Sequence, residues 1–155
     1  MKLTAVLALG ALCLPYCTAN TSYNCLSSSD ANTLATDFGK LVSAYTKKLA
    51  DQILTSDFID YSESINTLKD NGGTSPFPLL GMAFTSRADF EAQSSKQPSV
   101  PFQVKNVWYN CNVITVRWLS AQSPQPVVGI SVLQTVYSPK QGNPSNFQIN
   151  EIWAE

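Results

Sequence analysis

The sequence has 155 residues, of which 14% are charged, and its formal net charge is −1. This balance gives no electrostatic reason to expect nucleic acid or an anionic membrane as a partner. The sequence contains no histidine, which excludes a Ser-His-Asp or Cys-His catalytic set and leaves too few ligands for a zinc site. We therefore expect no metal and no other cofactor.

The first nineteen residues have the layout of a secretory signal peptide. One early lysine precedes an apolar run, Leu3–Leu14, and the small residues Cys17 and Ala19 stand at positions −3 and −1 of a cleavage site. The run is shorter than the about 20 residues that a membrane-spanning helix needs. The sequence thus predicts a signal peptide over 1–19 and one secreted, extracellular domain over 20–155, without membrane attachment after cleavage. The alternatives are a membrane anchor and a buried N-terminal helix.

Cleavage at this position removes two of the four cysteines and leaves Cys25 and Cys111. Two cysteines in an oxidising compartment usually pair, so we expect a disulfide bond between them. It closes a loop of about 86 residues and stabilises the fold by about 4 kcal/mol on the chain-entropy model. The alternative is a reactive thiol. A glycosylation sequon begins at Asn20, at the predicted mature N-terminus.

The amino-terminal half of the domain is predicted to be mainly helical. Apolar residues recur at helical spacing from Leu34 to Tyr45, after serines that can cap a helix. A shift of phase at Leu49 indicates a second, short helix that is bent from the first. The later elements are a strand over 57–64, a long loop around Gly72-Gly73 with one helical turn at 65–69, a short strand over 82–84, and a third helix over 85–97 that Thr85 or Ser86 caps.

The carboxy-terminal half alternates between apolar and polar residues, as strands do. The predicted strands cover 101–110, 113–120, 126–138 and 146–154, and short turn-like segments separate the members of each pair. In the first strand, the period of two places Phe102, Val104 and Trp108 on one side. Helices followed by an antiparallel meander predict an α+β domain in which helices pack on one face of a curved sheet.

This order resembles the nuclear transport factor 2-like superfamily, which includes ketosteroid isomerases, scytalone dehydratase and polyketide cyclases. The resemblance is carried by the segments "NCLSSSDANTLATDF", "LTSDFIDYSES", "FTSRADFEA", "VWYNCNVITVRW" and "QINEIW" and by their spacing. Within the superfamily, the chain is most similar to small secreted domain proteins of filamentous fungi. The resemblance implies a cone in which three helices of the amino-terminal half close over the concave face of a mostly antiparallel sheet and leave an apolar ligand pocket.

Polar residues on otherwise apolar strand faces are the candidates for a site in this cone. Asp60 shares a side of its strand with Phe58 and Ser62, and Gln134 shares a side with the valines and isoleucine of 128–136. Glu151 is predicted to share a side with Phe147, Ile149 and Trp153. If these sides point into the cone, the ligand-binding residues are Asp60, Trp108, Trp118, Gln134, Glu151 and Trp153. A carboxylate that is desolvated there has a raised pKa and can act as a general base.

Each candidate also has a purely structural interpretation. Asp60 can hydrogen-bond a loop or a helix end, and Glu151 can be solvated at a sheet edge. A bulge would move every side chain that follows it to the opposite face of the sheet. The related enzymes offer little support, because scytalone dehydratase-like sites use histidines. The aspartate base of ketosteroid isomerase-like sites falls at Ser62, and the helix tyrosine falls nearer Phe38 than Tyr45, so neither role is filled.

Three hypotheses of function follow. The first is a secreted, non-catalytic domain that binds a small hydrophobic ligand in the cone. The second is an enzyme of the cyclase, dehydratase or isomerase type with Asp60 or Glu151 as general base. The third is a secreted interaction or effector-like protein that acts through the outer sheet face, which in this superfamily often forms a homodimer. The outer face is predicted to carry Gln103, Lys105, Tyr109 and Arg117, whose simplest interpretation is a solvated surface.

Overall fold

The structure is a computed structural model that describes residues 24–70, 80–121, 125–140 and 142–155. The predicted signal peptide, Asn20 and Gly72-Gly73 lie outside the described residues. The described elements, in chain order, are α1 (Ser28–Ser43), α2 (Lys47–Ile53), β1 (Leu54–Ser62), α3 (Glu63–Asp70), β2 (Met82–Phe84), α4 (Arg87–Ser94), β3 (Phe102–Tyr109), β4 (Val113–Ser120), β5 (Val127–Tyr137) and β6 (Phe147–Ala154).

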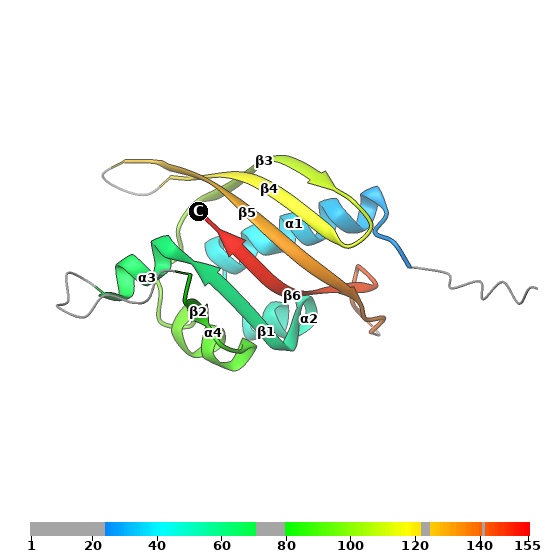
Figure 1. The fold of residues 1–155 in the computed structure, drawn as a ribbon, viewed down its shortest axis with the longest axis horizontal. Helices are drawn as coiled ribbons and strands as arrows, with labels where there is room; N and C mark the ends of the chain where they lie inside the picture. The colour runs from blue at the N-terminus through cyan, green and yellow to red at the C-terminus, as the bar shows by residue number, and fades with distance from the viewer. Residues whose placement is uncertain (1–23, 71–79, 122–124, 141) are drawn as a thin grey trace, which may run out of the picture.

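The described strands form one six-stranded sheet in the order β2-β1-β6-β5-β4-β3 (Figure 1). The pairing is antiparallel throughout, except that β1 and β6 run parallel at the centre of the sheet. The predicted four-strand antiparallel meander is therefore confirmed, and the predicted short strand over 82–84 coincides with β2. The last of the described strands along the sequence, β6, lies between β1 and β5.

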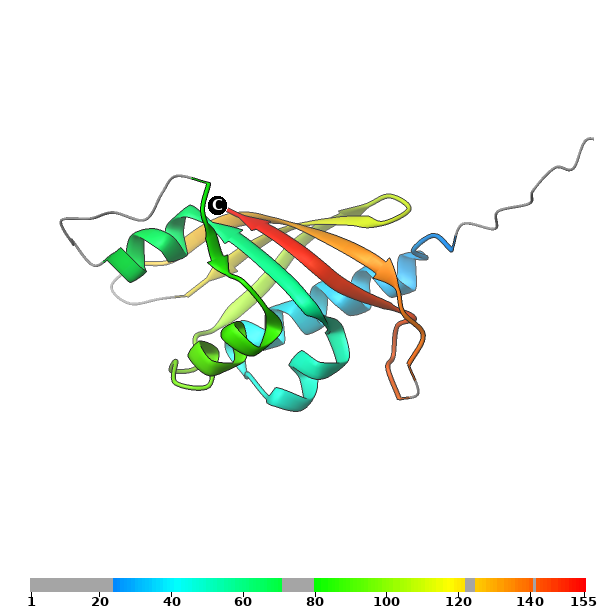
Figure 2. The same ribbon diagram turned by 60° about the horizontal axis from the view of Figure 1, so that its bottom comes forward.

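Helices α1, α2 and α4 all lie on one side of the sheet, as Figure 2 shows. Each begins at a hydroxyl residue whose side chain accepts a hydrogen bond from a backbone N–H of the first turn: Ser27 for α1, Thr46 for α2 and Ser86 for α4. At the start of α1, the carboxylate of Asp30 accepts a hydrogen bond from the backbone N–H of Ser27, which completes a capping box. No described helix covers the opposite, outer face of the sheet. None of the described helices is long and apolar enough to span a membrane.

The hydrophobic core fills the space between these helices and the inner sheet face. Large side chains that are fully buried come from both layers; they are Leu34, Ile53, Leu54, Phe58, Ile114, Val116, Leu133 and Ile149. Burying one such side chain contributes about 1.5–3 kcal/mol. The side chain of Gln148 is also buried, and its amide nitrogen donates to the backbone oxygens of Gln52 and Leu54, both at 3.0 Å. Gln148 thereby ties β6 to the end of α2.

Cys25 and Cys111 form the predicted disulfide bond. The bond joins the segment before α1 to the turn between β3 and β4, and next to it the backbone N–H of Leu26 donates to the oxygen of Cys111 at 2.9 Å. The helical layer is thus fixed covalently to one end of the sheet.

Two bulges decide which side chains reach the inner face. In β3, Val104 pairs with Trp118 whereas Asn106 pairs with Arg117, so Lys105 is an extra residue. The prediction that Trp108 shares a face with Val104 is therefore wrong: Trp108 points outward. Tyr109, which was predicted to point outward, instead lies opposite the buried Ile114, on the face of the sheet that the helices cover.

The second bulge is in β6. Thr135 pairs with Ile149 whereas Gln134 pairs with Glu151, which leaves Asn150 as the extra residue. Phe147 and Ile149 are buried in the core, but Glu151 and Trp153 lie on the outer face. The prediction that all four share one face is wrong for this reason.

Candidate functional site on the outer sheet face

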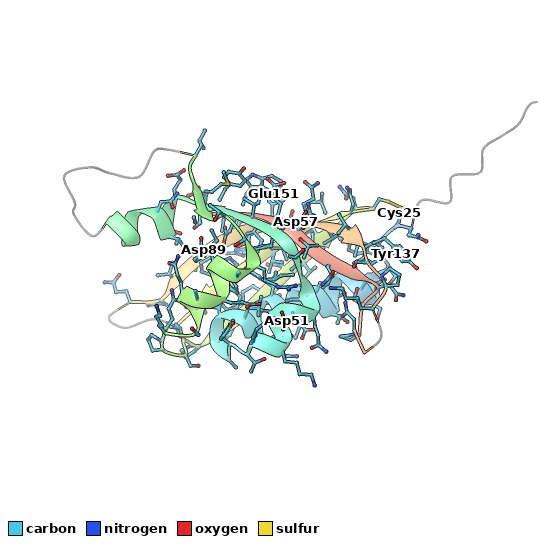
Figure 3. All side chains as sticks on the ribbon, turned by 90° about the horizontal axis from the view of Figure 1, so that it is seen from below. Cys25, Asp51, Asp57, Asp89, Tyr137 and Glu151 are labelled. Atoms are coloured by element: carbon cyan, nitrogen blue, oxygen red, sulfur yellow. A yellow bond between two sulfur atoms is a disulfide. The ribbon has the colours of Figure 1, made fainter. Side chains whose placement is uncertain are left out.

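The structure divides the six residues that were predicted to bind a ligand between the two faces of the sheet. Asp60 and Trp118 lie on the inner face, toward the helices. The other four lie together on the outer face; they are Trp108, Gln134, Glu151 and Trp153. In Figure 3, Glu151 lies on the side of the sheet away from Asp51 and Asp89 of the helical layer. The six residues therefore do not converge on one pocket.

The inner-face residues lie in packed surroundings. Asp60 is 5% exposed and lies directly opposite Phe84 of β2. The ring of Phe90 packs edge-on against both Phe84 and Phe58, with centroids 5.3 and 5.8 Å apart. This aromatic cluster fills the interior beside β1, and Phe90 supplies it from α4.

The contacts of the Trp118 side chain with its neighbours explain its position on the inner face. Its indole N–H donates to the hydroxyl of Ser131 at 3.0 Å, and its ring packs 5.1 Å from that of Phe102. The ring lies over Gly129, where an added Cβ atom would come within 2.3 Å of it. The small residues Gly129 and Ser131 therefore make the space that Trp118 occupies.

The two sides of β5 differ in apolar content, and the outer side is the more apolar one. Its inner side carries Val127, Gly129, Ser131, Leu133, Thr135 and Tyr137, and in the buried middle of the strand only Leu133 is a large apolar residue. Its outer side carries Val128, Ile130, Val132, Gln134 and Val136. Val128 is 57% exposed and Ile130 is 49% exposed. Solvated strand faces are normally polar, so the outer side of β5 has the composition of a face that is covered.

The exposed apolar residues continue across the neighbouring strands in one row. The register places Trp108, Thr115, Val132, Trp153, Tyr61 and Met82 side by side on the outer face, from β3 to β2. Trp108 is 53% exposed and Trp153 is 39% exposed. The rings of Tyr61 and Trp153 are stacked, with centroids 6.3 Å apart and an interplanar angle of 9°. We call this row, together with Val128 and Ile130, the outer apolar face.

Charged residues stand beside the outer apolar face in an ordered arrangement. Arg117 is exposed on β4, directly opposite Ile130. Glu155 lies opposite Ile130 on the other side of β5, where two backbone hydrogen bonds of 2.9 and 3.1 Å join the two residues. Glu151 lies opposite Gln134, two residues from Trp153. The cation and the acids thus stand on opposite sides of β5. Gln103 and Lys105, at the β3 edge, bond to each other at 2.6 Å.

Two hollows lined by described residues lie away from the outer apolar face. One, of about 360 Å³, lies between α2 and the β5–β6 loop, and another, of about 190 Å³, lies between the end of α1 and the residues after α4. Neither is lined by any of the six predicted ligand-binding residues. Within the described ranges, no three cysteine or acidic side chains gather as a metal site.

Beside the larger hollow, an ion-pair network joins α2 to α4. Lys47 pairs with Asp51 at 2.9 Å and with Glu91 at 3.2 Å, and Arg87 contacts both acids at 3.3 Å. The hydrogen bonds to Asp51 and Glu91 raise the pKa of Lys47, and the bond from Lys47 holds the pKa of Asp51 below its ordinary value. Because each charge has a partner within the network, we interpret it as structural.

Comparison with known proteins identifies the family and the fold. No curated protein matches the sequence. The structure is similar to a SnoaL-like protein of unknown function from Burkholderia thailandensis E264, with a TM-score of 0.60 and 9% identity over 84% of this chain and 97% of that one. It is also similar to an NTF2-like protein of unknown function from Burkholderia xenovorans LB400, with a TM-score of 0.55 and 10% identity over 81% of each chain.

A third similar structure is an NTF2-like protein of unknown function from Cytophaga hutchinsonii ATCC 33406, with a TM-score of 0.55 and 8% identity over 83% of this chain and 91% of that one. At these identities the similarity shows the fold alone. The family model of the NTF2-like domain matches residues 24–155, which is most of the sequence. The chain therefore belongs to the NTF2-like domain family.

Proposed function

We propose that this domain is a secreted, non-catalytic interaction protein that binds another protein through the outer apolar face. The observation that carries the proposal is the inversion on β5, where the outward side is more apolar than the side that packs on the helices. Such a strand gains from burying its outer side as well as its inner side. The predicted signal peptide supports an encounter with the partner outside the cell.

The extent of the exposed apolar surface supports the proposal. Contiguous apolar patches of more than a few hundred Å² are uncommon on monomeric proteins and usually mark contact sites. Apolar or aromatic side chains at least 39% exposed on β5, β6 and β3 gather on the outer face; they are Val128, Ile130, Val136, Trp153 and Trp108. Three others that are equally exposed, Val127, Tyr137 and Tyr109, lie on the inner side at the ends of their strands. Burial of apolar surface contributes about 25 cal/mol per Å², so covering the outer face provides a driving force for association.

The residue types also fit a protein contact. Tryptophan, tyrosine and arginine are the side chains that most often dominate the binding energy of protein interfaces. The outer face presents Trp108, Trp153 and Tyr61 with Arg117 beside them. The stacked pair of Tyr61 and Trp153 is already ordered, so binding requires little further loss of side-chain freedom there.

The hypotheses based on the cone receive less support. Four of their six residues lie on the outer face. Glu151, one of the two candidate general bases, is among them, so only Asp60 lies on the side of the sheet that faces the cone. A ligand in the cone would also have to displace the packed rings beside β1.

Photo-crosslinking tests the proposed function. A photoreactive benzoylphenylalanine replaces Ile130 in the tagged full-length chain, and crosslinks are mapped by mass spectrometry in the medium of cells that secrete it. We expect a crosslink to defined residues of one protein, and we expect Trp153→Ser to abolish it. The control probe replaces Val42, which is exposed on α1 in the helical layer. Equal capture at both positions, or none at 130, would overturn the proposal.

A further inference from the structure

We propose that the larger hollow, between α2 and the β5–β6 loop, binds a small hydroxylated anion of the size of a monosaccharide that carries a carboxylate or a phosphate group. The hollow has a volume of about 360 Å³. The described residues that line it are Lys47, Lys48, Asp51, Gln52, Lys140 and Asn143. It lies apart from the outer apolar face, so a ligand bound there leaves that face free for a protein partner.

Two side-chain hydrogen bonds hold the β5–β6 loop against the end of α2. The side-chain nitrogen of Gln52 donates to the backbone oxygen of Gly142 at 3.3 Å, and that of Asn143 donates to the backbone oxygen of Gln52 at 3.2 Å. Within the loop, the backbone N–H of Asn143 donates to the oxygen of Lys140 at 3.1 Å. These contacts fix the wall of the hollow that carries Lys140, so the fold itself brings Lys140 and Lys48 to one hollow.

The hollow carries a surplus of positive charge. The ion-pair network beside it contains two cations and two acids, so its charges cancel. Lys48 and Lys140 stand outside this network, and neither forms an ion pair with any residue that the structure describes. Two ammonium groups that line one hollow repel each other, and an anion between them is attracted to both. Ammonium groups are common partners of phosphates and carboxylates.

The lining favours a hydroxylated ligand over an apolar one. All six lining side chains are charged or carry an amide, whereas pockets for apolar ligands are lined mainly by hydrophobic side chains. The amide of Gln52 has two N–H donors and one acceptor oxygen, and among the described residues only its bond to Gly142 engages them. The amide can therefore hydrogen-bond a hydroxyl group while the two lysines bind the charge.

The volume of the hollow narrows the class of ligand further. Sites for small molecules measure about 300–1,000 Å³, and this hollow lies at the lower end of that range. One water occupies about 30 Å³ in the liquid, so the hollow has room for about twelve waters. That is more space than an inorganic phosphate or sulfate ion fills. A single sugar ring with its charged group fits the space better.

Titrations followed by NMR test the site. The disulfide-bonded protein is titrated at low ionic strength with glucuronate, glucose 6-phosphate, neutral glucose and inorganic phosphate, and amide chemical shifts locate each ligand. We expect both sugar anions to shift the amides of α2 and of residues 142–146. Both should bind at least about 10-fold more tightly than glucose or inorganic phosphate. Raising the ionic strength to about 1 M should weaken their binding, because salt screens charges near the surface.

Charge removal tests the role of the two lysines. The double variant Lys48→Gln, Lys140→Gln should weaken the binding of both sugar anions at least about 10-fold, and each single variant about 3-fold. Lys96→Gln is the matched control, because Lys96 is exposed after α4 and does not line the hollow. It should change the affinity by less than about 2-fold. All three lysines are exposed, so each variant should keep the unfolding midpoint of the original protein.

The possible outcomes are distinct. Binding of only one of the two sugar anions would keep the site and identify the charged group that it prefers. Equal affinity for inorganic phosphate or for neutral glucose would overturn the ligand class. No binding of either sugar anion, chemical shifts confined to other regions, or an equal loss in the Lys96 variant would overturn the site. The crosslinking probe at Ile130 reports on the other side of the sheet, so the proposed function stands or fails separately.

Discussion

The inner and outer faces of β5 carry side chains of different size, which alternate along the same strand. On the inner face, Gly129 and Ser131 are small because the indole ring of Trp118 occupies the space above them. On the outer face, Val128 and Ile130 are large and apolar although nothing within the described chain covers them. The inner face is therefore specified by the volume of neighbouring side chains, whereas no neighbour within the described residues accounts for the large apolar side chains of the outer face. The predictions below test this difference, from the largest expected effect to the smallest.

The first prediction compares a core ring with an exposed ring. Phe58→Ala removes a fully buried side chain from the aromatic cluster and should lower the free energy of unfolding by about 3–5 kcal/mol. Trp108→Ala, on the outer face, should lower it by less than about 1 kcal/mol. Urea unfolding followed by tryptophan fluorescence or circular dichroism measures both. A loss for Trp108→Ala as large as that for Phe58→Ala would show that the outer face belongs to the core.

The second prediction concerns two adjacent residues of β5 that point in opposite directions. Gly129→Ala places a Cβ atom 2.3 Å from the ring of Trp118 and 2.5 Å from the backbone oxygen of Glu155, and should cost about 1–3 kcal/mol of stability, as overpacking does. Ile130→Ala removes three carbon atoms from the outer side and should cost less in the monomer. If Trp118 is the cause, adding Trp118→Phe to Gly129→Ala should recover part of the loss in a double-mutant cycle. If Gly129→Ala lowers the stability by the same amount with and without Trp118→Phe, the ring of Trp118 is not the cause.

The third prediction concerns the capping box that starts the helix over the inner face. Burial raises the pKa of Asp30, but hydrogen bonds from Ser27, Ser145 and the backbone of Asn146 outweigh it, so the pKa lies below its ordinary value of 3.8. The stability that Asp30 contributes is therefore present above pH 3.8 and is lost as the pH falls through the lower, folded pKa.

Asp30→Ala should cost about 1 kcal/mol at neutral pH and should remove this part of the acid dependence. Thermal unfolding between pH 2 and pH 7, on the order of the range in which carboxylates titrate, measures both effects. The matched control is Asp57→Ala, at an exposed position of β1. An unchanged acid dependence in the Asp30 variant would contradict the prediction.

The fold was largely predictable because its signals are local. Helical periodicity and hydroxyl caps indicated α1, α2 and α4, and the alternation of residues indicated the meander. The disulfide followed from the two cysteines that remain after the predicted cleavage. The helix and strand signals each lie within one segment of the chain, and the disulfide follows from the number of cysteines.

The candidate site was less predictable because its signals are not local. The bulges at Lys105 and Asn150 have no glycine to mark them, yet they turn Trp108, Glu151 and Trp153 to the outer face. Alternation on β5 correctly grouped Ile130 with Gln134 but could not show which side is inward. That choice depends on Trp118, which approaches from another strand.

The central position of β6 has a consequence for how the domain acquires its structure. β6 is the last of the described strands along the sequence, yet it joins β1 to β5, and Gln148 satisfies the carbonyl groups at the end of α2. Until residues 147–154 are in place, β1 and β5 each have an open edge toward the gap. Such long-range pairing slows folding and makes it cooperative. We therefore expect the chain to remain without a closed core until residues 147–154 insert between β1 and β5.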